Sequence, residues 1–217
     1  MRRNENGRPA ETPTDSPAAA PPLGFLAATA ALCGALVMVV EVMGSRVIGP
    51  FFGASLFVWT ALITVTLVAL AIGYAAGGWL ADRRGTPDTL YGLILLAGVS
   101  ILCVPWLKSP VLTNLAPAGL RAGAFLSSLV LFGPGLLLLG CVSPFVVRLS
   151  APSLERMGRT VGLFYAVSTI GSFLGTVATG FFLIAWLGVR GVFLLAGSLL
   201  VGLAAVWFVV FRRRWAA

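Results

Sequence analysis

The feature that most constrains this chain is an uncharged, apolar stretch from Leu56 to Ala81. It contains 26 residues, and at about 1.5 Å per residue a helix of that length crosses a hydrocarbon layer of roughly 30 Å. The stretch ends in a charged segment, 82–88, in which Gly85 and Pro87 interrupt a helix. We therefore expect one membrane-spanning helix that is followed by a sharp turn on the cytoplasmic side.

The composition extends this expectation to the whole chain. Of the 217 residues, 59% are hydrophobic and 10% are charged, whereas a soluble domain carries about 25% charged residues. A chain this apolar cannot bury its surface in a water-soluble core of this size. We therefore expect an integral membrane protein whose surroundings are the lipid bilayer.

Further apolar stretches predict an all-α bundle of six transmembrane helices in one domain, from residue 23 to residue 214. The approximate spans are 23–47, 56–81, 90–107, 122–147, 161–187 and 191–211. Residues 1–22 are polar and rich in Pro and Ala, which predicts a disordered cytoplasmic tail.

The segments between the spans contain turn signals. The segment 49–53, with Gly-Pro-Phe-Phe-Gly, predicts a turn after the first span, and Pro110 and Pro117 predict a loop after the third. Gly133–Gly135 and Pro144 predict a broken or kinked fourth span. A very short turn is expected at 188–190.

The positive charges predict the orientation. With six spans both termini lie on one side, and that side holds eleven of the fifteen basic residues. By the positive-inside rule we expect a multi-pass protein of the cell (inner or plasma) membrane with both termini cytoplasmic. The net charge of +8 follows from these helix ends and loops and forms no clustered basic face, so we expect no nucleic-acid partner.

Residue types also limit the chemistry. The chain has no His, and Cys33, Cys103 and Cys141 lie in apolar runs without CxxC spacing. No nucleophile–base pair is evident either. We therefore predict no catalytic residue, no metal site and no cofactor.

Glu41 is the acidic residue expected within or near the apolar layer, and by default such a residue indicates a functional site. Glu41 and Arg46 are candidates for a substrate or proton site, in which Glu41 would bind a cation or an amine or carry a proton. Their spacing places them about 140° apart around a helix, so they are poor partners for each other. The alternative is an interfacial acid that pairs with Arg46, Arg121 or Arg190.

Small and hydroxylated residues predict close helix contacts. Gly73 and Gly77 form one GxxxG pattern, and Gly171 and Gly175 form another. A polar stripe runs along the fifth span and comprises Ser168, Ser172, Thr176 and Thr179. The stripe favours interhelical hydrogen bonds, and the alternative is the lining of a hydrophilic cavity.

The segment 78–85, GWLADRRG, ends the second span. Its candidate residues are Gly78, Asp82, Arg83 and Gly85. Asp82 could accept hydrogen bonds from a neighbouring helix N-terminus, while Arg83 could pair with a carboxylate or reach lipid phosphates. The alternative is a solvated turn. The segment resembles the signature loop between the second and third helices of major facilitator superfamily (MFS) transporters, although Thr86 and Pro87 stand where that family continues with basic residues.

A broader resemblance covers nearly all of residues 23–212. The segments 41–60, 73–83, 143–149 and 158–183 are similar to the membrane region of fused MFS/spermidine synthase-like proteins. The resemblance implies one half of an MFS transporter, a six-helix unit that in those proteins is joined to an aminopropyltransferase-like domain. That catalytic domain has no counterpart here, because only Glu155 among the carboxylates follows Asp88, so we expect no enzymatic activity.

Two functions follow from this resemblance. The first is a membrane module that handles a small solute together with a synthase-like partner protein or as a homodimer. The second is a stand-alone homodimeric transporter of a small solute, for which a cationic (polyamine-like) molecule is one candidate. Its weakness is that a dimer would contain only two copies of Glu41.

Overall fold

The structure is a computed structural model, and it describes residues 21–150 and 157–211. These residues form only helices, without a β-strand. The α-helices are α1 (Leu23–Phe52), α2 (Leu56–Arg84), α3 (Pro87–Leu115), α4 (Gly119–Ser150), α5 (Met157–Ala178) and α6 (Ile184–Val206). A 3₁₀ turn (Ala116–Ala118) joins α3 to α4, a π-helical turn (Thr179–Leu183) joins α5 to α6, and a second π-helical turn (Trp207–Phe211) follows α6.

Four continuous helical stretches in the described residues are long and apolar enough to cross a membrane. They are Leu23–Phe52, Leu56–Arg84, Pro87–Ser150 and Met157–Phe211. The last two fold back on themselves at glycines with positive φ, Gly119 at 83° and Gly188 at 61°, a conformation that costs glycine little. The turn expected at 188–190 is therefore present, and it begins at Gly188.

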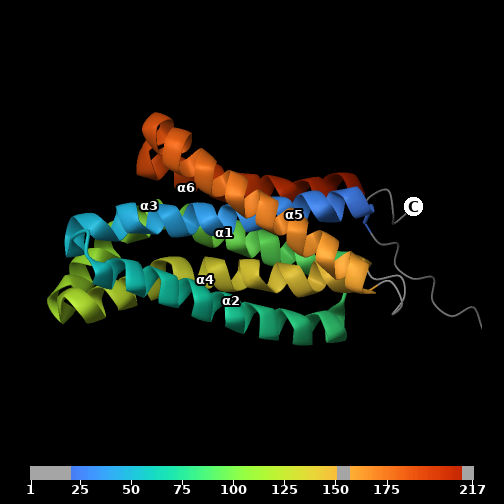
Figure 1. Ribbon diagram of the computed structural model, residues 1–217, viewed down its shortest axis with the longest axis horizontal. Helices are drawn as coiled ribbons and strands as arrows, with labels where there is room; N and C mark the ends of the chain where they lie inside the picture. Colours follow the sequence, from blue (N-terminus) through green and yellow to red (C-terminus); the bar gives the residue numbers. More distant parts are fainter. Residues whose placement is uncertain (1–20, 151–156, 212–217) are drawn as a thin grey trace, which may run out of the picture.

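Consecutive helices run in opposite directions along the long axis of the bundle (Figure 1). We call the end that holds Leu23, Arg84–Pro87, Met157 and Phe211 the base, and the opposite end, with Gly53 and Gly188, the apex. The first and last described helices meet at the base, where the rings of Phe25 and Phe211 stack with their centroids 4.8 Å apart. The two ends of the described chain thus lie on the same side.

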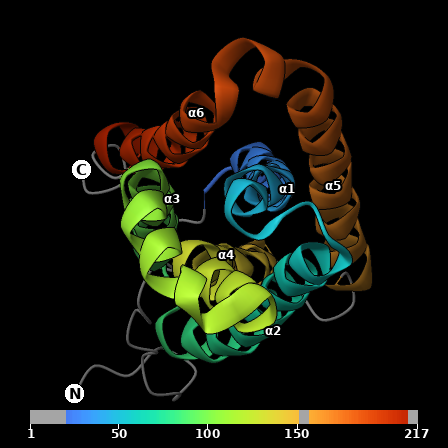
Figure 2. The ribbon, with the colours of Figure 1, turned by 90° about the vertical axis from the view of Figure 1, so that its left-hand side faces the viewer.

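Helix α1 lies inside the bundle, surrounded by the other helices (Figure 2). Its buried residues recur every three or four positions and face several neighbours, as in Leu36, Val40 and Met43. The most extensive helix contacts are those of α2 with α4, α1 with α5, and α3 with α4 and α6. These contacts organise the bundle into tightly packed pairs.

The turn between α2 and α3 is fixed by local chemistry at the base. Thr86 caps α3, because its Oγ1 accepts a hydrogen bond from the backbone N–H of Thr89 at 3.3 Å. Pro87 occupies the first helical position, where a missing N–H costs nothing. Further along, Asp88 Oδ1 accepts a hydrogen bond from Trp207 Nε1 at 2.8 Å and so joins α3 to the end of α6.

Several helices extend beyond the expected spans. The prediction of a turn at 49–53 was wrong, because α1 continues through Pro50 to Phe52 and the turn occupies 53–55. Helix α3 likewise continues through Pro105 and Pro110 to Leu115, so the expected loop is reduced to the turn around Pro117. Helix α4 passes through Pro134 and Pro144 without a break. A proline removes one backbone donor, and packing against neighbouring helices holds the helix together on both sides.

Of the expected disordered tail, 1–22, residues 1–20 lie outside the described part of the chain, whereas Pro22 forms the N-cap of α1.

Candidate solute-binding cleft

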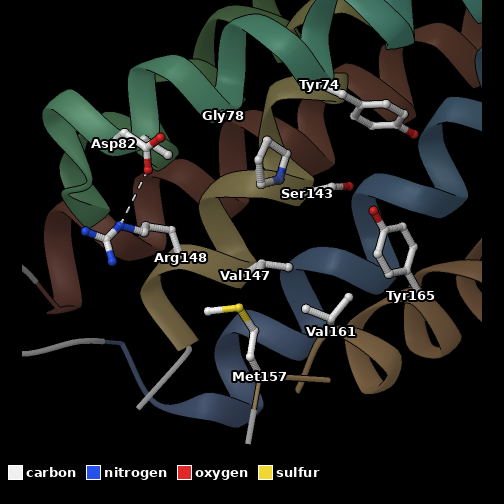
Figure 3. Close-up of a pocket in the computed structure, with 11 residues that line it drawn as sticks. Tyr74, Gly78, Asp82, Ser143, Val147, Arg148, Met157, Val161 and Tyr165 are labelled. Atoms are coloured by element: carbon white, nitrogen blue, oxygen red, sulfur yellow. Dashed lines mark ion pairs between the residues drawn. The ribbon is translucent and has the colours of Figure 1, made fainter. Parts of the chain in front are cut away.

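A cleft opens between α2, α4 and α5 at the base of the bundle (Figure 3). Its volume is about 430 Å³, within the range of roughly 300–1,000 Å³ that is usual for small-molecule sites. The lining residues are Tyr74, Gly78, Ala81, Asp82, Ser143, Pro144, Val147, Arg148, Met157, Val161 and Tyr165. Most of this lining is apolar.

The cleft continues toward the middle of the bundle. A second cavity of about 180 Å³ shares Tyr74 and Ser143 with the first and reaches Gly34 and Met38 of α1. A third, of about 20 Å³, shares Ser143 and Tyr165 with the first. We refer to these three adjoining cavities together as the cleft.

The two sides of the cleft are each closely packed and α1 also packs on α2 and α4, whereas α5 makes little contact with α4. On one side, Gly77 of α2 leaves no room for a side chain, since an added Cβ would lie 2.5 Å from the Cα of Cys141 in α4. Gly73 meets the backbone of Gly140 in the same way. On the other side, α5 packs on α1 and makes few contacts with α4. Close contacts at glycine therefore hold each pair together, and the space between the pairs remains open.

The α1–α5 side of the cleft is assembled by the second glycine pattern. Gly171 and Gly175 lie directly against the backbone of α1 at Ala31 and Ala35. Apart from these glycines, Phe164 is the buried residue of α5. Helix α5 is thus attached along one narrow line, and its remaining faces turn toward the cleft and the surroundings of the bundle.

The mouth of the cleft carries one acid and one base. Asp82 Oδ1 and Arg148 Nε are 3.9 Å apart, with side chains that are 80% and 61% exposed. A pair this exposed contributes little to stability. Asp82 and Arg148 are the charged residues of the cleft lining, so the lining carries no net charge.

Glu41 lies one helical turn beyond the deep end of the cleft. It lines a minor pocket with Thr66 of α2 and Leu136 of α4, each about one turn further toward the apex than the cleft residues Leu70 and Leu139. Glu41 is half-buried, and in the described part of the chain its carboxyl group forms no hydrogen bond or ion pair.

Arg46 does not join Glu41 at this position. It lies on the exposed surface of α1 nearer the apex, and within the described residues no ion pair connects the two side chains. Arg121 and Arg190, the other expected partners, lie over the rings of Phe57 and Trp106 at 4.7 and 5.5 Å from the ring centroids.

The candidate residues of the segment 78–85 lie in different surroundings, and two of them border the cleft. Gly78 and Asp82 line the cleft. Arg83 lies over the ring of Trp79, 4.1 Å from its centroid, and Trp79 is exposed. An added Cβ at Gly85 would lie 2.5 Å from the carbonyl oxygen of Ala81.

The hydroxyl stripe of α5 serves several contacts. Ser168 and Ser172 line the deeper part of the cleft. Ser172 also donates a hydrogen bond to the carbonyl oxygen of Gly34 at 2.9 Å, whereas Thr176 donates to Ser172 O within its own helix. The stripe therefore provides both cavity lining and helix contact, and Ser172 takes part in both.

Sequence reasoning did not single out Tyr74, Ser143 and Tyr165 as site residues. They come from three helices that are far apart in the sequence, so no spacing pattern links them. The available signal was chemical: each places a hydroxyl group inside an otherwise apolar span.

No protein-family model matches the chain, and no solved structure matches it. The chain is 33% identical over 165 residues to a protein of Mycolicibacterium smegmatis named as a triacylglyceride transporter. The aligned region covers 68% of this chain and 28% of that protein. The chain therefore spans less than a third of the length of this relative.

Proposed function

We propose that the chain is a membrane transport module that binds an apolar or amphipathic solute in the cleft between the α2–α4 and α1–α5 pairs. The observation that carries the proposal is the pair of adjoining cavities that share Tyr74 and Ser143, one with its mouth at Asp82 and Arg148 and the other at Gly34 near the middle of the bundle. The similarity to a protein named as a triacylglyceride transporter supports transport and an apolar cargo.

The proposed arrangement is a six-span half of an MFS-like transporter with both termini cytoplasmic. Its support is the alternating direction of α1 to α6 and the meeting of Phe25 with Phe211 at the base. Transporter halves pair around a central site, so a second half would be a second copy of this chain or another protein. The synthase-like partner stays a prediction from the resemblance.

An apolar cargo fits the cleft better than a polyamine does. A polycation would require several carboxylates, and the cleft lining contains Asp82 alone, already beside Arg148. Glu41 lies beyond the deep end of the cleft, where a proton or cation would couple to movement of the cargo.

A reconstituted assay tests the proposal. Proteoliposomes that contain the protein are expected to move a fluorescent acylglycerol faster than protein-free vesicles. The Gly78→Leu variant should abolish this movement, because Gly78 lines the cleft and has open space for a side chain. Gly92→Leu is the matched control, since Gly92 in α3 also has open space but lies outside the cleft. Equal movement by both variants would overturn the proposal.

Two further measurements refine it. Glu41→Gln is expected to abolish movement while the protein remains folded, and full activity of that variant would remove Glu41 from the mechanism. Purification from native membranes at low detergent, followed by mass determination, distinguishes a homodimer from a complex with a synthase-like protein.

A further inference from the structure

Three hydroxyl-bearing residues each line more than one of the adjoining cavities of the cleft. Tyr74, Ser143 and Tyr165 all line the large cavity. Tyr74 and Ser143 also line the deeper cavity, and Ser143 and Tyr165 also line the smallest. We call these three residues, which are shared between adjoining cavities, the hydroxyl cluster.

The cluster lies at similar depths on opposite sides of the cleft. Tyr74 precedes Arg84, the last residue of α2, by ten residues, and Tyr165 follows Met157, the first residue of α5, by eight, which places them roughly 15 and 12 Å from the base along their helices. The two phenol groups extend toward the space beside Ser143 rather than toward the base (Figure 3). This direction differs from that of an interfacial aromatic belt, in which polar tips point toward water.

In the described residues, none of the three hydroxyl groups forms a hydrogen bond. Some other hydroxyls of the bundle have partners, as where the Tyr91 hydroxyl lies 3.1 Å from Thr29 Oγ1 and Ser172 donates to α1, whereas the buried hydroxyls of Ser55, Ser127 and Thr179 have none among the described residues. A polar group without a partner is costly in an apolar surrounding. The hydroxyl cluster is therefore a set of donors and acceptors without partners among the described residues, on a mostly apolar lining from which Tyr74 and Tyr165 are still accessible, with 47% and 61% of their surface exposed.

The charges of the cleft select the kind of ligand. The cluster itself is neutral, and the charged residues of the lining, Asp82 and Arg148, lie together at the mouth. A carboxylate or phosphate at the depth of the cluster would have no free cation beside it, and an amine would have no free acid. A neutral oxygen-bearing group can both accept hydrogen bonds from the hydroxyls and donate to them.

We infer that Tyr74, Ser143 and Tyr165 form a subsite for the neutral polar group, an ester carbonyl or an alcohol, of a long-chain acyl lipid. The hydrocarbon chain lies along the apolar lining on both sides of the cluster. This inference rests on the proposed function, since it specifies the recognition of cargo within the same cleft.

Photolabelling of the purified protein in lipid nanodiscs tests the subsite. One probe is a monoacylglycerol with a diazirine in its chain, and the second is a hydrocarbon of the same length with the same diazirine and no oxygen. The wild-type protein should be labelled more strongly by the monoacylglycerol. The combined Tyr74→Phe, Ser143→Ala and Tyr165→Phe variant should lose this preference. Each hydrogen bond that is removed is expected to lower the ratio of monoacylglycerol to hydrocarbon labelling by about fivefold.

The Tyr91→Phe variant is the matched control, because it removes a tyrosine hydroxyl outside the cleft. It should keep the preference. If the combined variant does not fold, the Tyr165→Phe variant replaces it. This variant should fold, because Tyr165 is 61% exposed and the ring is retained. Loss of one hydrogen bond is expected to lower the preference about fivefold. An unchanged preference in the folded variant, or stronger labelling by a fatty-acid probe, would overturn the subsite.

The Gly78→Leu variant separates failure of the subsite from failure of the proposed function. If it lowers labelling by both probes while the hydroxyl variants change nothing, the cleft binds apolar molecules and the subsite is wrong. If it leaves labelling by both probes unchanged, the cleft is not the binding place and both proposals fall.

Discussion

Gly77 and Gly78 are neighbours on α2, yet they face two different kinds of surroundings. An added Cβ at Gly77 would lie 2.5 Å from the Cα and 2.8 Å from the carbonyl oxygen of Cys141, whereas at Gly78 it would meet nothing within 4 Å. The first glycine joins α2 to α4, and the second lines the cleft. One face of α2 thus packs closely against α4, and the adjacent face lines the open cleft.

The comparison of Gly77 with Gly78 indicates that the rigid contacts of the bundle lie within helix pairs. Glycine lets backbones approach closely within each helix pair, where lipid supplies no hydrophobic drive. A third contact of this kind joins α3 to α6 through Gly98 and Gly197. The space between α2 and α5 lacks such a contact, whereas α1 packs on α2, where an added Cβ at Gly44 would lie 2.7 Å from Leu62. The opening is therefore confined to the side of the bundle between α2, α4 and α5.

The largest effect is expected from substitution at the close contact of α2. Gly77→Leu should lower the free energy of unfolding by about 3 kcal/mol or abolish folding, because the side chain would overlap the α4 backbone. Gly78→Leu should leave the thermal midpoint in detergent near that of the wild type. Similar midpoints for both variants, measured by fluorescence-detected size exclusion after heating, would show that the two glycines do not differ.

The α1–α5 contact is expected to be nearly as sensitive. In the Gly175→Leu variant the side chain would meet the α1 backbone at Ala35, whose carbonyl oxygen lies 2.6 Å from the added Cβ. We expect a loss of about 2 kcal/mol in detergent. Gly162→Leu, at an open position of the same helix, serves as the control, and an equal loss there would count against a specific α1–α5 contact.

A smaller effect should follow at the base of α3 and α6. Trp207→Phe removes the N–H that donates to Asp88 Oδ1 at 2.8 Å and keeps an aromatic ring in the stack with Tyr91. The expected loss of unfolding free energy is about 1–2 kcal/mol, with unchanged photolabelling in the cleft. A change in labelling would mean that this contact and the cleft are coupled.

The smallest effect on stability is expected at the mouth. Asp82→Asn removes an exposed ion pair with Arg148, and such pairs contribute about 0–1 kcal/mol. The thermal midpoint should change little, whereas labelling by a fatty-acid probe should rise, because Arg148 would then be unpaired at the entrance. A large drop in the midpoint would show that the pair holds α2 to α4.

Much of the architecture could be predicted from the sequence because apolar length is a direct signal for membrane-spanning helices. The patterns at Gly73–Gly77 and Gly171–Gly175 identified residues that lie against other helices, but not which helices, since spacing within one helix says nothing about its neighbour. Prolines misled the prediction of helix ends, as at Pro50 and Pro110, because the bundle tolerates a lost hydrogen bond that an isolated helix would not. The hydroxyl cluster depends on three helices meeting, and no local pattern encodes that.

We propose above that an open cleft lies between the α2–α4 and α1–α5 pairs. The rate at which a charged maleimide, added from the base side, labels a thiol beside this cleft tests its openness directly. In a Cys33→Ala, Cys103→Ser background, which removes the thiol that lines the deeper cavity and the exposed one, the Gly78→Cys and Gly92→Cys variants place a thiol at similar depths on α2 and α3, and both positions have room for it. We predict rapid labelling of the Gly78→Cys variant and little labelling of the Gly92→Cys variant. Equal rates, or labelling of the Gly92→Cys variant alone, would contradict an open cleft beside α2.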